Sequence, residues 1–250
     1  MLFRSRARIS ASLEKKRLRD QERALLDQLQ IERAKAERLL QNVLPKAIAE
    51  RLKAGQRTIV DSFIDATVLF ADIVGFTRIA SKQSPHRTVQ LLNEIFSGFD
   101  RIVEQFELEK IKTIGDAYMT AAGLPLPAAD HAVRSVRAAL ALTQFIETRN
   151  VTSAMKWGLR VGIHSGAVVA GIVGKHKYAY DVWGDTVNIA SRLESASEPG
   201  RVNISAYTYE LVRKHFVCEY RGKLAAKGKG AIDMYFAVRE INGSEPPPAR

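Results

Sequence analysis

Apolar residues recur every three or four positions between Leu13 and Val43, in a stretch without glycine or proline. Ala, Leu, Glu, Arg, Lys and Gln dominate this stretch, and these residue types favour helix. The recurring positions follow alternating steps of four and three, with two glutamates among them: Leu18, Glu22, Leu25, Leu29, Glu32, Ala36, Leu39 and Val43. This spacing predicts a short parallel coiled coil, and the alternative is a lone amphipathic helix lying on its own domain.

A second, shorter helix is predicted after Pro45, because proline breaks or kinks a helix interior. The segment KAIAERLKAG places Ile48 and Leu52 on one inward side and ends at Gly55, a typical helix stop. We therefore expect three parts. Residues 1–55 form a helical segment with a kink near Pro45, residues 56–240 form one globular domain, and the polar, proline-rich residues 241–250 are disordered.

Strand-like and helix-like patterns alternate through the predicted globular domain. ATVLFADIV has the pattern of a buried strand, residues 85–106 that of a helix, and EKIKTIGDAYMTAAG that of two strands around a Gly-Asp turn. HAVRSVRAALALTQFI and residues 186–195 are predicted helices, while KWGLRVGIHSG and AVVAGIVG are strand-like. This order predicts an α/β or α+β sandwich, in which helices cover one or both faces of a mainly antiparallel sheet.

Composition narrows the class of protein. The 250 residues are 46% apolar and 26% charged, which is ordinary for a globular chain with one main domain. The single cysteine excludes an internal disulfide and favours a reduced, cytoplasmic setting. No apolar run approaches the ~20 residues that span a bilayer, and the basic N-terminus does not resemble a signal peptide. We expect the chain as given to be soluble.

Basic residues are concentrated at the N-terminus, where residues 1–19 contribute +6 of the net charge of +11. Three interpretations fit this run: a solvated helix end, a segment beside a membrane anchor, or an arm that binds nucleic acid. No interleaved aromatic residues and no nucleic-acid motif support the last of these. We therefore expect no nucleic-acid partner.

Two aspartates stand directly beside strand-like sequence: Asp72 follows VLFA and Asp116 follows KTIG. A buried carboxylate is costly without a partner, so an ionised pair at strand ends usually has a cation between its members. Hard oxygen ligands, with no cysteine or histidine cluster nearby, suit Mg²⁺ or Mn²⁺ bound together with substrate phosphates. Alternatively, each aspartate caps a turn or a helix.

Asn188 and Arg192 occur four residues apart in YDVWGDTVNIASRLES, a stretch that also carries Asp181. On a helix, residues at this spacing share a face. A guanidinium fork there would match the geometry of a phosphate. The alternative is an exposed arginine that pairs with Glu194 or Glu198.

Four separated motifs, FADIVGFT, EKIKTIGDAYM, LRVGIHSG and YDVWGDTVNIASR, together resemble the catalytic domain of the class III nucleotidyl cyclases. The resemblance runs from about Ile59 to Val238 and is specific, because the motifs occur in the family's order with their charged positions kept. AERLLQNVLPKAIAERLKAG also resembles the helical segment that precedes this domain in many such cyclases. The resemblance implies an α+β, ferredoxin-like fold (βαββαβ, palm-type) preceded by a helical transducer.

The resemblance also implies how the reaction is divided among residues. Two ions, Mg²⁺ or Mn²⁺, would bind Asp72 and Asp116, with the Ile73 carbonyl as a further ligand. They would lower the pKa of the ribose 3′-hydroxyl and hold the triphosphate for in-line displacement. Arg192 would stabilise charge in the transition state, and Asn188 would orient the ribose.

Lys112 and Asp181 resemble the family's purine-reading pair, in which lysine donates to an adenine ring nitrogen and aspartate accepts from the exocyclic amine. Guanine would meet this pair mismatched and leave buried polar groups without partners. Guanylate-specific relatives typically carry Glu and Cys at these positions. ATP is therefore the favoured substrate and cyclic AMP the product. A guanylate or dual-specificity cyclase and a catalytically silent cyclase-like domain are the alternatives.

Further triphosphate contacts are expected from the backbone at Phe76 and Thr77, and from Arg160 and Lys227, with Lys229 as an alternative to Lys227. For each of these, a turn or a solvated charge is an equally good interpretation.

The resemblance places the site between two domains, with Asp72, Asp116 and Arg160 on one and the remaining residues on the other. Because one chain carries both sets, we expect a head-to-tail homodimer with two equivalent sites and parallel N-terminal helices. A change in helix register would then open or close the sites. The basic run RSRAR fits a patch beside an upstream membrane or sensor region.

Overall fold

The computed structural model describes residues 2–76, 80–81, 83–153, 155–174, 178–226 and 230–241. Thr77, Lys227 and Lys229, which we expect to contact the triphosphate, lie outside these residues, as does the predicted disordered tail from residue 242 onward. The chain divides into two units, Met1–Ala54 and Gly55–Arg250. In the described part of the chain, no helix combines the length and apolar character that a membrane span requires.

The N-terminal unit consists of α1 (Leu2–Gln41) and α2 (Lys46–Lys53), with Pro45 as the N-cap of α2. Helix α1 begins well before the predicted start at Leu13 and continues unbroken to the predicted kink region. The large apolar residues of the predicted seam, of which Val43 lies just beyond the end of α1, are more than half exposed: Leu18, Leu25, Leu29, Leu39 and Val43. An apolar stripe therefore remains uncovered in the single chain.

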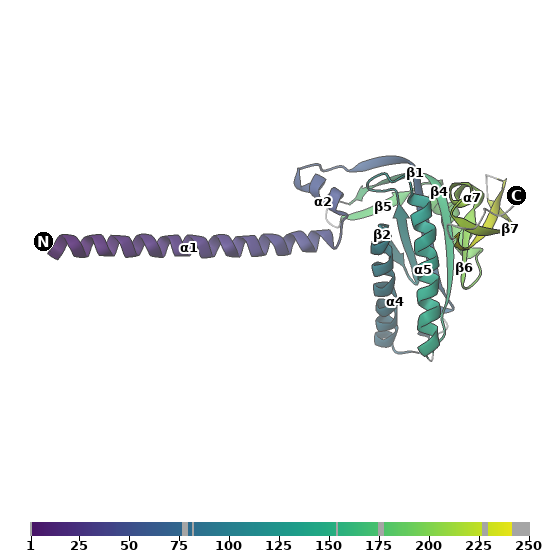
Figure 1. Cartoon of the computed structure of the whole chain (residues 1–250), viewed down its shortest axis with the longest axis horizontal. Coiled ribbons are helices and arrows are strands. Elements are labelled where there is room, and N and C mark those ends of the chain that lie inside the picture. Colours follow the sequence, from purple (N-terminus) through teal and green to yellow (C-terminus); the bar gives the residue numbers. More distant parts are fainter. Residues whose placement is uncertain are drawn as a thin grey trace. The chain divides into compact units, whose positions relative to one another are not determined.

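The second unit is built around one mixed sheet (Figure 1). Its described strands are β1 (Val60–Val74), β2 (Glu109–Ile114), β3 (Ala117–Ala122), β4 (Gly158–Val173), β5 (Ala179–Trp183), β6 (Arg201–Ser205), β7 (Phe216–Ala226) and β8 (Gly230–Glu240). The main path runs β2-β3-β1-β4-β6-β8-β7, and β5 pairs with β4. Only the β4–β6 pairing is parallel among these strands. The predicted mainly antiparallel sheet is confirmed.

The helices of this unit whose bounds the structure describes are α4 (Pro85–Gln105), α5 (His131–Thr152), α6 (Asp185–Ser195) and α7 (Ala206–Val212). Helices α4 and α5 lie side by side against one face of the sheet (Figure 1). On β1, Leu69, Ala71 and Ile73 point to this face and join the main core with Phe99 of α4. Since successive side chains of a strand alternate, Asp72 must point to the opposite face.

Helix α6 lies on this opposite face, directly over β4. A Cβ atom at Gly162 would come within 1.9 Å of the Glu194 amide nitrogen and 2.6 Å of the Ala190 carbonyl oxygen. Thr186 at the start of α6 donates a hydrogen bond to the Ala167 carbonyl at 2.7 Å. Gly162 therefore allows the helix backbone to approach the strand closely, and this fixes which side of α6 faces the sheet.

Most predicted elements agree with the structure, including the β2–β3 hairpin, whose turn contains Gly115 at φ +62°. KWGLRVGIHSG and AVVAGIVG, both predicted to be strand-like, together form the single strand β4. The two stretches are continuous because β1, with 15 residues against the 16 of β4, pairs with β4 along almost its whole length, apart from a register shift between Phe63 and Ala66.

Candidate active site

Asp72 and Asp116 lie at neighbouring positions at one end of the sheet. In the strand register, Asp72 of β1 is opposite Ala117 of β3 on one side and Arg160 of β4 on the other. Asp116 directly precedes Ala117, in the turn that joins β2 and β3. Burial raises the pKa of the Asp116 carboxyl, and the negative charge of Asp72 raises it further. The fold thus brings together two carboxylates that are 44 positions apart in the sequence.

Arg160 lies between two carboxylates. Its Nη2 atom donates to Asp72 Oδ2 at 2.7 Å, and its Nε atom is 3.1 Å from Glu194 Oε1. The second contact is an ion pair without hydrogen-bond geometry, since both atoms lack a hydrogen-bond partner. Asp72 and Arg160 are partly exposed, whereas Glu194 is buried. The guanidinium therefore connects the strand-end aspartate to helix α6.

These residues fit a divalent cation, provided that the substrate completes its coordination. Carboxylate oxygens are the ligands that Mg²⁺ and Mn²⁺ prefer. The repulsion that raises the pKa of Asp116 is of the kind that a bound cation would relieve. In the described part of the chain, no group of three or more His, Cys, Asp or Glu side chains could hold a metal. Ile73 buries its side chain in the core, so only its backbone carbonyl could contribute.

Lys112 and Asp181 meet across 69 positions of sequence. Lys112 Nζ is 2.5 Å from Asp181 Oδ2, and Asp181 Oδ1 accepts a hydrogen bond from the Val182 amide at 2.8 Å. A register shift in β2 between Lys110 and Lys112 separates the two lysines. Lys110 therefore pairs with Asp100 on α4 instead. The side chains of Lys112 and Asp181 are 41% and 20% exposed, so a ligand can reach the pair.

Asn188 and Arg192 share the exposed side of α6. The buried side of this helix comprises Thr186, Ile189, Ala190, Leu193 and Glu194. The alternative in which Arg192 pairs with a nearby glutamate is wrong, because Glu194 pairs with Arg160 and Glu198 pairs with Arg221. Arg192 forms no hydrogen bond or ion pair within the described residues. Both side chains therefore point away from the sheet that carries Asp72.

A single chain thus presents three separate groups of candidate residues. The described residues contain no hydrogen bond or ion pair that joins the Lys112–Asp181 pair to Asp72 or Asp116. The exposed side of α6, which carries Asn188 and Arg192, faces away from the sheet that carries Asp72. Phe76 packs against Trp157, with ring centroids 6.1 Å apart, so its side chain belongs to the core and only its backbone could meet a phosphate.

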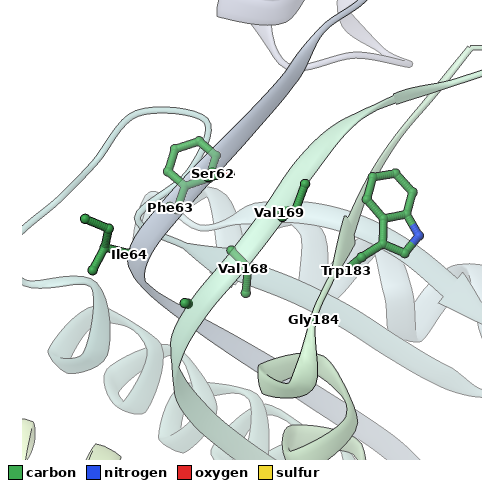
Figure 2. A pocket seen from close by; sticks show the side chains of 8 residues that line it. Ser62, Phe63, Ile64, Val168, Val169, Trp183 and Gly184 are labelled. Atoms are coloured by element: carbon green, nitrogen blue, oxygen red, sulfur yellow. The ribbon is translucent and has the colours of Figure 1, made fainter.

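An apolar surface lies around β1, β4 and the end of β5 (Figure 2). It surrounds a pocket of about 290 Å³ lined by Ser62, Phe63, Ile64, Ala167, Val168, Val169, Trp183 and Gly184. Trp183 follows Asp181 by two residues, and Gly184 is the N-cap of α6. Ile64 is 90% exposed and Trp183 is 39% exposed. Large apolar side chains therefore remain in water beside the candidate site.

Sequence reasoning missed the position of Glu194, which it treated only as a surface partner for Arg192. The helical period contained the missing signal. Ala190 and Glu194 are four residues apart, and each directly follows one of the apolar positions Ile189 and Leu193. A helix that packs through Ile189 and Leu193 therefore also turns Glu194 inward.

Similarity to known proteins agrees with this geometry. A profile of the adenylate and guanylate cyclase catalytic domain matches residues 59–239. An adenylate cyclase of Mycobacterium bovis is 41% identical over 227 residues, which are 87% of this chain and 51% of that protein. Guanylate cyclase soluble subunit beta-2 of Rattus norvegicus is 38% identical over 239 residues, which are 95% of this chain and 35% of that subunit. The chain therefore spans about half, or less, of the length of these curated relatives.

Solved structures lead to the same family. The guanylate cyclase domain of RhGC from Catenaria anguillulae, in complex with GTP, matches with a TM-score of 0.69 at 35% identity. The match covers 72% of this chain and 100% of that domain. Since motifs, fold and overall similarity all agree, the chain belongs to the adenylate and guanylate cyclase catalytic domain family, the class III nucleotidyl cyclases.

Proposed function

We propose that the domain is an adenylate cyclase that converts ATP to 3′,5′-cyclic AMP and pyrophosphate. Its relatives include both adenylate and guanylate cyclases at similar identity, so overall similarity does not choose between ATP and GTP. The observation that carries the choice is the contact between Lys112 Nζ and Asp181 Oδ2. One donor and one acceptor lie within reach of the same ligand edge, which suits the ring nitrogen and exocyclic amine of adenine.

In the proposed reaction, the ribose 3′-oxygen loses its proton and attacks the α-phosphorus, and pyrophosphate leaves in line. Asp72 and Asp116 would hold the divalent cation, which would supply Lewis-acid activation of the hydroxyl and neutralise charge on the triphosphate. Arg192 has no ion pair among the described residues, so its guanidinium is available for charge that develops on the α-phosphate. Asn188, on the same side of α6, orients the ribose.

We propose further that the site is completed by a second copy of the chain, in a head-to-tail homodimer. Three observations support this arrangement. Asn188 and Arg192 face away from the sheet that carries Asp72. The apolar surface around Ile64 and Trp183 is uncovered, and in the N-terminal unit the apolar seam of α1 is uncovered as well. A second copy of the chain would supply a partner for each of these surfaces.

Purified protein incubated with Mg²⁺ or Mn²⁺ and either ATP or GTP tests the proposed reaction. We expect cyclic AMP and pyrophosphate from ATP and much slower turnover of GTP. Asp72→Asn and Arg192→Ala should abolish activity while the circular dichroism spectrum stays unchanged. The double substitution Lys112→Glu and Asp181→Cys should shift the preference towards GTP. Faster turnover of GTP than of ATP by the natural chain would contradict the proposal, and so would binding of ATP without any turnover.

Mixing two inactive variants tests the shared site. In a dimer formed by Asp72→Asn and Arg192→Ala chains, one site carries both defects and the other carries neither. Refolding or subunit exchange in a mixture should therefore restore about a quarter of wild-type activity, because about half of the dimers are mixed. Removal of residues 1–44 should make activity depend more steeply on protein concentration if α1 helps dimerisation. A mixture that stays inactive, after mixed dimers have been detected, would rule out the shared site.

A further inference from the structure

Glu194 is a buried carboxylate that lies beside the metal-binding end of the sheet. Only 7% of the residue is exposed, and it is on the side of α6 that faces β4. Its Oε1 atom is 3.1 Å from Arg160 Nε, and its Oε2 atom accepts a hydrogen bond from the Ser195 hydroxyl at 3.2 Å. A carboxylate at this depth is costly unless a cation compensates it, and Arg160 is the cation that the structure places there.

Arg160 is shared between Glu194 and Asp72. While its Nε atom faces Glu194, its Nη2 atom donates to Asp72 Oδ2 at 2.7 Å. Asp72 is one of the two carboxylates that we propose as metal ligands, so the same carboxylate has two competing partners. A cation that binds Asp72 repels the guanidinium and takes its hydrogen-bond acceptor away.

We propose that Glu194 is a positioning residue for Arg160, and that it keeps the guanidinium in place when Asp72 exchanges its arginine partner for a divalent cation. This inference rests on the proposed function, because it assumes that Asp72 binds metal. With Glu194 present, Arg160 keeps one buried ionic partner throughout. Without it, Asp72 is the remaining carboxylate that contacts Arg160, and the arginine then competes with the metal.

The backbone around Glu194 explains why its carboxylate stays in reach of Arg160. The Glu194 amide nitrogen lies directly over Gly162, where a Cβ atom would come within 1.9 Å of it. Gly162 is two residues beyond Arg160 on β4, and both point to the face that α6 covers. Helix and strand are therefore held at a fixed separation, and the ionic contact connects the Asp72 end of the sheet to the helix that carries Asn188 and Arg192.

Direct binding of Mn²⁺ to the full-length chain, measured by electron paramagnetic resonance without nucleotide, tests the proposal. We expect Glu194→Gln to weaken Mn²⁺ binding by about ten-fold or more, the usual effect of losing a residue that orients a metal ligand. The matched control is Glu198→Gln, which removes an exposed carboxylate that pairs with Arg221 instead. This variant should bind Mn²⁺ as the natural chain does.

A double variant separates an effect through Arg160 from a loss of folding, and Glu198→Gln controls for the loss of one negative charge. If Glu194 acts through Arg160, then Arg160→Gln added to Glu194→Gln removes the competitor and should restore much of the lost Mn²⁺ affinity. Unchanged Mn²⁺ binding by Glu194→Gln would overturn the inference, and so would a double variant that binds as weakly as the single one. Neither outcome depends on cyclic AMP formation. An inactive natural chain would contradict the proposed function but would leave this measurement interpretable.

Discussion

Burial of Glu109 gives the fold a pH dependence that a single substitution should remove. Glu109 begins β2, opposite Ala121 of β3, and its partly buried carboxyl has no ion pair or hydrogen bond to any other described residue. Burial raises the pKa of its carboxyl from the ordinary 4.5 to about 7. A difference of about 2.5 between the two pKa values corresponds to roughly 3 kcal/mol, an upper value because the side chain retains some contact with solvent.

The sign follows from which state holds the proton. Between pH 4.5 and about 7, folded Glu109 keeps a proton that the unfolded chain has released. Protonation therefore stabilises the fold at low pH, and this stabilisation is lost as the pH rises through about 7. Glutamine has the same shape and does not ionise. We expect Glu109→Gln to gain stability relative to the natural chain as the pH rises from 4.5 to 8, by at most about 3 kcal/mol.

Urea denaturation at a series of pH values, followed by tryptophan fluorescence at one protein concentration, measures this difference. Trp157 is buried and should report unfolding of the second unit. Glu104→Gln on α4 is the matched control, since it removes an exposed carboxylate near Glu109 in sequence. Its free energy of unfolding should run parallel to that of the natural chain. Parallel curves for Glu109→Gln as well would refute the argument from burial.

Three further outcomes are expected. Gly162→Ala should lower the free energy of unfolding, measured by urea denaturation, by about 1–3 kcal/mol and should reduce cyclase activity, because the new Cβ atom would collide with the backbone of α6. Retention of full stability would contradict the close approach of helix and strand. Burial raises the pKa of the Cys218 thiol to about 12. Cys218 should therefore react with iodoacetamide at pH 8 far more slowly in the folded chain than in urea, and equal rates would contradict its burial. Tyr118→Phe should lower the free energy of unfolding in urea by about 1 kcal/mol, because it removes the hydrogen bond that the Tyr118 hydroxyl donates to Asp100 at 2.5 Å. Lys110 still pairs with the Asp100 carboxylate in this variant. An unchanged free energy of unfolding would show that the hydrogen bond adds no net stability.

Local patterns in the sequence were sufficient for several features. Apolar periodicity and the lack of glycine and proline predicted helix α1, and the residue pattern predicted α4, whose start Ser84 caps by accepting a hydrogen bond from the Arg87 amide. The Gly-Asp turn predicted the hairpin that carries Asp116. Four motifs in order identified the cyclase family, and family membership is confirmed. These features depend on residues that are close in the chain, so the sequence itself contains the signal.

Tertiary structure alone decided which charged groups meet. Lys112 reaches Asp181 because a register shift in β2 turns it away from Lys110, and such a shift depends on pairing with β3. Glu194 meets Arg160 because α6 packs on Gly162, whereas the sequence analysis treated Glu194 only as a surface partner of Arg192. Each contact joins residues far apart in the chain, and its geometry is set by strand register and close packing. Local sequence therefore determined the elements and their chemistry, whereas long-range packing decided which of these groups face one another.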